Sequence, residues 1–177
     1  MTPRQWQIAT AILIMAGAVV LQFVVLARLP FVAPGLVAAA VIAIGMAGGQ
    51  TFGGVAGFGA GLALDVLPPA QGLVGSSALA LVVVGVMSGR VRDPRGLAPL
   101  QLFAVAAGLA AVGAAIVTVF TGLLGGALPD ARVLATDLII YTLLTALVAL
   151  AVVPLVGAAL RRVTGARRHR RLHPVTR

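Results

Sequence analysis

Few side chains in this sequence could carry out acid–base or nucleophilic chemistry. The chain has no Cys, Lys or Glu, and its two His, His169 and His173, lie in an Arg-rich C-terminal segment. General acid–base and nucleophilic catalysis need a second group within hydrogen-bonding reach, and Ser76, Ser77 and Thr118 have no partner base in the sequence. The histidines also lack metal-ligand spacing to any carboxylate. We therefore expect no catalytic, metal-binding or cofactor-binding site.

The composition excludes whole classes of protein. Of 177 residues, 60% are hydrophobic and 10% are charged, and the mean hydropathy is +1.11. About a quarter of a typical soluble domain is charged. A chain this short cannot hide so much apolar surface in one water-surrounded core. A soluble globular protein and a disordered protein are both excluded.

The charged residues divide the chain into long apolar stretches. About 20 apolar residues cross a bilayer as a helix, in which every backbone polar group is paired, so each stretch can span a membrane at least once. The sequence therefore predicts an all-α integral membrane protein. The stretches without Asp or Arg are 5–27, 29–64, 66–89, 96–129 and 138–160.

The second stretch, 29–64, is long enough for two helices. Its middle reads Gly48-Gly49-Gln50-Thr51, which is typical of a turn or a helix boundary. A break there gives six transmembrane helices, whereas five spans are possible without it. The helices predicted on either side of the break are 36–47 and 52–67, and those that follow are 73–89, 100–124 and 136–160.

Arginine positions set the expected orientation, because cytoplasmic loops of membrane proteins are rich in basic residues. Six spans with the N-terminus inside and five with it outside both divide the 13 arginines into 11 cytoplasmic and 2 external. Both place the C-terminus in the cytoplasm, so we expect one transmembrane domain over 1–160 and a basic cytoplasmic tail over 161–177. The arginines expected to set topology and contact anionic lipids, with no nucleic acid partner, are Arg90, Arg92, Arg95, Arg161, Arg162, Arg167 and Arg168.

Glycine is concentrated in one segment. Gly45, Gly49, Gly53, Gly57 and Gly61 follow one another at every fourth position. In a membrane, such a face lets another backbone approach closely. It is either a docking face for another protein's helix or a close contact within this protein's own bundle. We favour the second, because a bundle has many internal contacts to make.

Asp65 is the only acid in the first half of the chain. An ionised Asp deep in lipid costs about 2.5–3.5 kcal/mol on insertion scales, so intramembrane acids are functional candidates. Alternatively, Asp65 lies at a solvated or capped helix end. Asp137, near the start of the last helix, is expected to interact with the helix dipole.

Residues 57–65 read Gly-Phe-Gly-Ala-Gly-Leu-Ala-Leu-Asp, and a Pro/Gly-rich turn then leads into a Leu/Ala-rich helix. This run, the Gly57–Asp65 motif, resembles the G-F-x-x-G-L-x-x-D signature of the MreD family of rod shape-determining proteins. The resemblance covers about residues 20–92. On this basis we assign helix packing or partner binding to Gly53, Gly57, Phe58, Gly61 and Asp65, and a turn to Pro68 and Pro69.

The resemblance implies a non-catalytic scaffold subunit of the bacterial cell-elongation complex, in the plasma membrane. The implied partners are an MreC-like protein, a RodA-like glycosyltransferase and a class B penicillin-binding protein, which together support lateral peptidoglycan synthesis and cell shape. MreD-like proteins form a six-helix bundle thought to be similar to the substrate-binding subunit of energy-coupling-factor transporters. That similarity favours six spans, with both termini cytoplasmic.

The alternative function is that of a small-molecule, vitamin-type substrate-binding membrane subunit of a transporter. Such a subunit needs an outward pocket with polar and aromatic groups that orient its ligand. The chain offers only Trp6, Tyr141 and six Phe for this purpose. We therefore favour the scaffold.

Overall fold

The computed structural model describes residues 3–24, 35–66, 75–91, 97–124 and 130–165. These residues contain six helices and no strand, so the predicted all-helical fold with six helices is confirmed. The last helix begins before predicted residue 136 and continues beyond predicted residue 160. The helices are α1 (Pro3–Val24), α2 (Leu36–Gly48), α3 (Gln50–Val66), α4 (Ser76–Ser88), α5 (Pro99–Leu123) and α6 (Ala131–Gly165).

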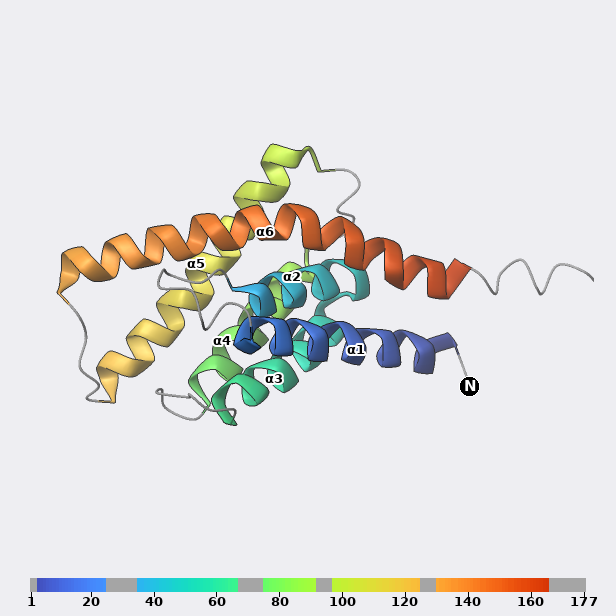
Figure 1. Cartoon of the computed structure of the whole chain (residues 1–177), viewed down its shortest axis with the longest axis horizontal. Helices are drawn as coiled ribbons and strands as arrows, with labels where there is room; N and C mark the ends of the chain where they lie inside the picture. The colour runs from blue at the N-terminus through green and yellow to red at the C-terminus, as the bar shows by residue number, and fades with distance from the viewer. Residues whose placement is uncertain (1–2, 25–34, 67–74, 92–96, 125–129, 166–177) are drawn as a thin grey trace, which may run out of the picture.

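The fold is organised around α2, which contacts each of the other five helices. In Figure 1 it lies in the middle of the bundle, between α1 and α6. Every residue from Val37 to Met46 is buried. A helix that is apolar on all sides has no face suited to water and must be covered on every side. The composition of α2 therefore explains its central position.

A sharp turn at Gly49 separates α2 from α3. Gly49 has a φ of +88°, a conformation that residues with a Cβ rarely adopt. The chain reverses there, and Gly53 of α3 comes to lie against the backbone of Gly45 in α2. The predicted break within Gly48–Thr51 is thus confirmed.

The glycines of α3 face α4, and the two helices pack backbone against backbone. A Cβ on Gly53 would collide with the Gly85 carbonyl, and a Cβ on Gly57 would collide with the Leu81 carbonyl. Further along, Gly61 lies against the backbone of Ala78 in the same way. The two helices are therefore antiparallel and in an approach that larger residues would prevent.

The second helix joins this contact through Gly45. A Cβ on Gly45 would meet both the Ser88 hydroxyl and the Gly85 carbonyl of α4. Helices α2, α3 and α4 consequently meet where Gly45, Gly53 and Gly85 lie. The glycine face packs within this chain, which is the alternative that the sequence favoured.

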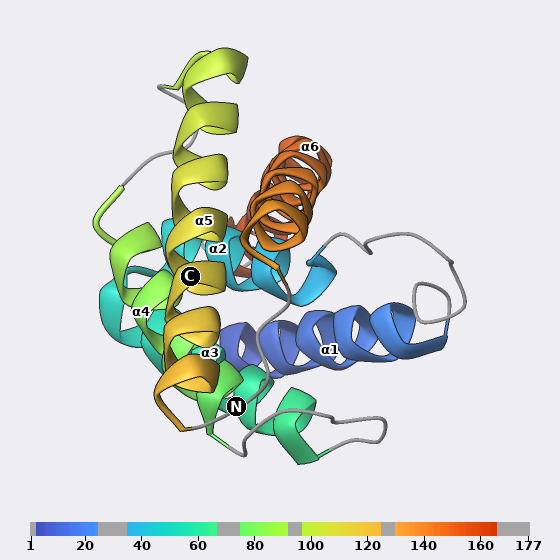
Figure 2. The ribbon, with the colours of Figure 1, turned by 90° about the vertical axis from the view of Figure 1, so that its left-hand side faces the viewer.

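The two longest helices lie outside this glycine-packed core. Both α5 and residues Ala131–Leu160 of α6 are long and apolar enough to cross a membrane. In an apolar stretch of 18 residues in each helix, however, only 28% is buried inside the protein. Figures 1 and 2 show the first turns of α5 extending beyond the other helices. Three apolar helical stretches are shorter, namely Ile8–Gln22, Leu36–Gly48 and Ser76–Ser88.

Replacing Gly57 with Ala is expected to destabilise the fold, because the new methyl group would overlap the Leu81 carbonyl and force α3 and α4 apart. Overpacking of this kind costs about 1–3 kcal/mol, which corresponds to a fall of several degrees in Tm. Thermal unfolding of the purified protein, followed by circular dichroism, measures the effect.

The matched control is Gly59→Ala in the same helix, because a Cβ at Gly59 has no other atom within 4 Å. Alanine favours helix by about 1 kcal/mol over glycine, so this variant should match or exceed the wild-type Tm. Equal Tm values for the two variants would contradict the packing described here.

Candidate functional site

The carboxylate of Asp65, in the last turn of α3, is buried and fully engaged with the next helix. Asp65 is only 8% exposed. One oxygen, Oδ2, accepts the backbone N–H groups of Gly75 at 2.8 Å and Ala78 at 3.2 Å. The other, Oδ1, accepts the N–H of Ser77 at 3.3 Å. The side chain at the end of one helix thus holds the beginning of the next.

This arrangement caps α4. The first N–H groups of a helix have no partner within the helix, and a negative charge is favourable at that end. Gly75, the residue before α4, has a φ of +100° and no side chain that could act as a cap. Asp65 supplies the missing acceptor from another helix. Its geometry matches the capped helix end, one of the two roles the sequence left open.

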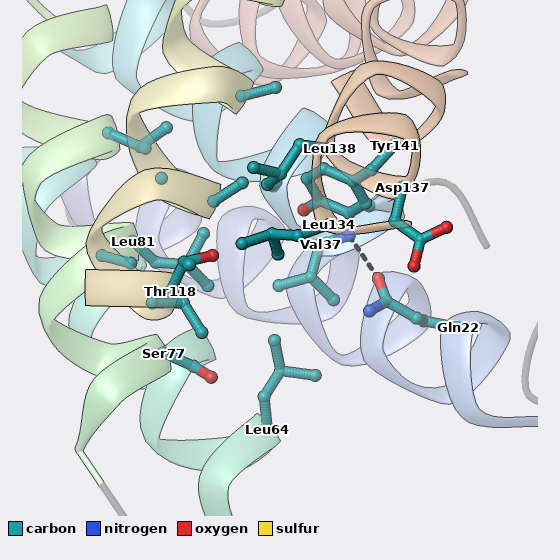
Figure 3. A pocket seen from close by; sticks show the side chains of 18 residues that line it. Gln22, Val37, Leu64, Ser77, Leu81, Thr118, Leu134, Asp137, Leu138 and Tyr141 are labelled. Atoms are coloured by element: carbon teal, nitrogen blue, oxygen red, sulfur yellow. Dashed lines mark hydrogen bonds between the residues drawn. The ribbon is translucent and has the colours of Figure 1, made fainter. Parts of the chain in front are cut away.

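The beginning of α2 is capped in the same way. Gly35 N–H donates to Oγ1 of Thr145 in α6 at 2.9 Å. Val37 N–H donates to Oε1 of Gln22 in α1 at 2.9 Å, the bond drawn as a dashed line in Figure 3. Tyr141 packs directly over Gly35, where a Cβ would collide with the phenol hydroxyl. Helices α2 and α4 therefore both follow an N-cap glycine. Side chains of other helices accept the N–H groups at their beginnings.

The buried polar side chains of the described residues are few, and all are satisfied. They are Asp65, Ser76, Ser88 and Thr145, and none is more than 8% exposed. Ser88 donates its hydroxyl to the Gly85 carbonyl at 3.0 Å. Within the part of the chain that the structure describes, no buried side-chain nitrogen or oxygen lacks a hydrogen-bond partner. Asp65, Ser88 and Thr145 all bond to backbone groups, so much of the interior polarity serves the backbone.

The Gly57–Asp65 motif has two faces. Gly57, Gly61 and Asp65 face into the bundle, where they contact α4 or the residue before it, whereas Gly59 is exposed. Phe58 and Leu62 point away from the bundle and are 54% and 41% exposed. These two residues lie one turn apart, so their side chains are neighbours on the helix surface. About half of each of these two large side chains is therefore exposed on the outer side of α3.

An apolar groove of about 550 Å³ runs between α1 and α3. We call it the α1–α3 groove. None of the described residues that line it is charged. Its lining residues are Ile8, Ala11, Ile12, Met15, Ala16, Val19 and Val20 of α1, with Phe52, Val55, Ala56, Gly59, Ala60 and Ala63 of α3.

A separate cavity of about 340 Å³ lies where all six helices approach one another, and we call it the six-helix cavity. Most of its lining is Ala, Val and Leu. Its polar lining residues are Gln22, Ser77, Thr118, Asp137 and Tyr141. In Figure 3, Gln22, Asp137 and Tyr141 lie on one side of the cavity, and Ser77 and Thr118 lie on the other.

The predicted arginine and proline positions are only partly described. Arg90 follows α4 and is exposed, while Arg161 and Arg162 belong to the last turns of α6. Several predicted positions lie outside the described residues, namely Pro68, Pro69, Arg92, Arg95, Arg167 and Arg168.

Sequence reasoning missed the roles of Gln22, Thr145 and Tyr141. Gln22 is a polar residue in the last turn of α1, and Tyr141 and Thr145 are polar residues within the apolar part of α6. A polar group in that position needs a partner, because burying it alone is costly. This cost predicts that Gln22 and Thr145 have hydrogen-bond partners inside the fold. It does not identify the helix end that each one caps.

Replacing Asp65 with Ala should lower the stability of the protein, because one buried and two partly buried N–H groups would lose their acceptor. Unsatisfied buried groups cost about 1–3 kcal/mol. Asp65→Asn should be intermediate, since an amide keeps one acceptor oxygen. Thermal unfolding of the two variants gives the order. Asp137→Ala is the control, because Asp137 is exposed; an equal loss of stability in that variant would contradict a specific cap.

Comparison of the chain with protein-family models, with curated proteins and with solved structures finds no match in any of the three. What the protein can do follows from its own residues and their geometry.

Proposed function

We propose that this chain is a multi-pass protein of the bacterial plasma membrane and a non-catalytic scaffold subunit of the cell-elongation (rod) complex. In this role it binds an MreC-like protein and supports lateral peptidoglycan synthesis and cell shape, as the resemblance of its Gly57–Asp65 motif to the MreD family implies. Other expected neighbours are membrane lipids, a RodA-like glycosyltransferase and a class B penicillin-binding protein.

The exposure of α5 and α6 supports a membrane environment. The core helix of a soluble protein is mostly covered by its neighbours. In α5 and α6, only 28% of the apolar 18-residue stretch is buried. Large apolar side chains such as Leu123 and Leu147 are exposed on them. A bilayer would cover these surfaces at no cost to the fold.

The borrowed caps also support this environment. Helices α2 and α4 have 13 residues each, or roughly 20 Å at 1.5 Å per residue. A hydrocarbon core of about 30 Å would enclose at least one end of such a helix. Water cannot pair a backbone N–H there, so a side chain must do so. Asp65, Gln22 and Thr145 meet that requirement.

The arrangement of the helices supports six spans. In Figure 1 the beginning of α1, marked N, and the end of α6 lie at the same end of the molecule. An even number of crossings is the simplest way to bring both ends to one side. Combined with the excess of arginine near the C-terminus, this favours cytoplasmic positions for both termini.

The single observation that carries the functional proposal is the two-faced motif. Gly57, Gly61 and Asp65 contact α4 or the residue before it. Phe58 and Leu62 are the large exposed side chains of the motif, so we assign contact with another protein to them. A partner helix therefore contacts the outer side of α3, not its glycine face. Asp65 already accepts three N–H groups within this chain, so we assign it to the fold and assign partner contact to Phe58 and Leu62.

The partner we assign to this outer side is the single membrane helix of an MreC-like protein, lying along the α1–α3 groove. Small residues such as Ala16, Gly59 and Ala63 line the groove and would let the partner backbone approach closely. Van der Waals packing supplies most of the affinity, because lipid provides no hydrophobic drive between helices. Phe58 is exposed on α3 about one helical turn from Val55, which lines the groove, and in this proposal it packs against the partner as an anchor.

The test is co-purification of wall-synthesis proteins from the native membrane with the wild-type protein and with Phe58→Ala. Loss of a buried aromatic anchor typically costs more than 1 kcal/mol, so recovery of the MreC-like protein should fall about tenfold. The matched control is Leu147→Ala, which truncates a similarly exposed apolar side chain, 60% exposed, on α6. That variant should recover the partner like the wild type.

Equal recovery with Phe58→Ala and Leu147→Ala would place the partner elsewhere. Recovery of a vitamin or of a transporter ATPase module, in place of wall-synthesis proteins, would contradict the scaffold and favour the transporter subunit.

A further inference from the structure

The six-helix cavity is separate from the α1–α3 groove, and the two share no lining residue. Its volume of about 340 Å³ lies within the range of small-molecule sites, which are mostly apolar and carry a few polar groups that orient the ligand. The cavity exists because small residues such as Ala110, Gly113 and Ala114 line it from α5. Larger side chains at these positions would fill it.

The polar groups of the cavity are not all occupied by the caps. Gln22 uses Oε1 to accept the Val37 N–H, and its amide N–H groups are not part of that bond. Tyr141 is hydrogen-bonded to Thr145. Among the described residues, Asp137 has neither a hydrogen bond nor an ion pair. The carboxylate at the edge of the cavity is therefore available to a ligand.

The charge of the lining selects one kind of ligand. Asp137 is the single charged residue among the cavity's described lining residues, and no Arg accompanies it. An anionic ligand would bring a second negative charge beside this carboxylate, and like charges repel. A cationic end would instead form a charge-assisted hydrogen bond with Asp137.

We propose that the six-helix cavity binds a small molecule with an apolar body and a protonated amine, the body lying among the Ala, Val and Leu side chains and the amine at Asp137. The hydroxyls of Ser77 and Thr118 face the far side of the body (Figure 3). Each of these hydroxyls can donate a hydrogen bond to the ligand or accept one from it. This site does not depend on the scaffold role, since it lies apart from the groove assigned to the partner helix.

Two fluorescent probes with the same three-ring body and opposite charges test the proposal, namely 9-(aminomethyl)anthracene and anthracene-9-carboxylate. Each is titrated into the purified full chain in nanodiscs of zwitterionic lipid, and the signal from empty nanodiscs is subtracted. The amine should bind saturably and at least tenfold more tightly than the carboxylate, because hydrogen bonds to charged groups are the stronger kind. Asp137→Asn should remove this preference.

Ala114→Phe locates the binding, because it places a large side chain in the cavity from α5. The variant should weaken amine binding at least tenfold. The matched control is Ala115→Phe, which alters an exposed neighbour that does not line the cavity and should bind like the wild type. Saturable binding that survives Ala114→Phe would overturn the assignment to this cavity. No saturable binding above empty nanodiscs, or equal affinity for the two probes in the wild type, would overturn the proposal even if Ala114→Phe fails to fold.

Discussion

A backbone N–H at the beginning of a short, enclosed helix needs an acceptor, and the arrangement of this protein follows from how that need is met. Helices α2 and α4 both begin after a glycine that offers no cap. The acceptors come from α1, α3 and α6, through Gln22, Asp65 and Thr145. Each cap therefore also ties two helices together. The few polar side chains in the interior fix how the apolar helices sit, which apolar packing alone specifies only weakly.

Close glycine packing and capping act together on α3 and α4. The glycines let the two backbones touch, and Asp65 fixes where α4 begins relative to the end of α3. A single short motif supplies both functions on one side of a helix. Its remaining side, with Phe58 and Leu62, is exposed and is the surface on which we propose that the partner helix packs.

Local chemistry in the sequence predicted most of the fold. Apolar stretches between charges predicted the helices, and the Gly48–Thr51 break separated α2 from α3, because turn residues act locally. The caps of α2 could not be predicted, since Gly35 and Thr145 are 110 residues apart and nothing local pairs them. The six-helix cavity also escaped prediction. A pocket is expected from aromatic and polar side chains, whereas this cavity arises from the volume that Ala and Gly leave empty among residues of six helices.

The proposed function requires six membrane crossings, with the α2–α3 turn on the cytoplasmic side. Single-cysteine labelling in intact cells tests these crossings directly. The chain has no Cys of its own, so each introduced thiol reports one position to a membrane-impermeant maleimide. Asp130→Cys should be labelled from outside, whereas Thr2→Cys and Thr51→Cys should react only after the membrane is permeabilised. Labelling of Thr2→Cys from outside, with Thr51→Cys unreactive even after permeabilisation, would show five crossings and contradict the account.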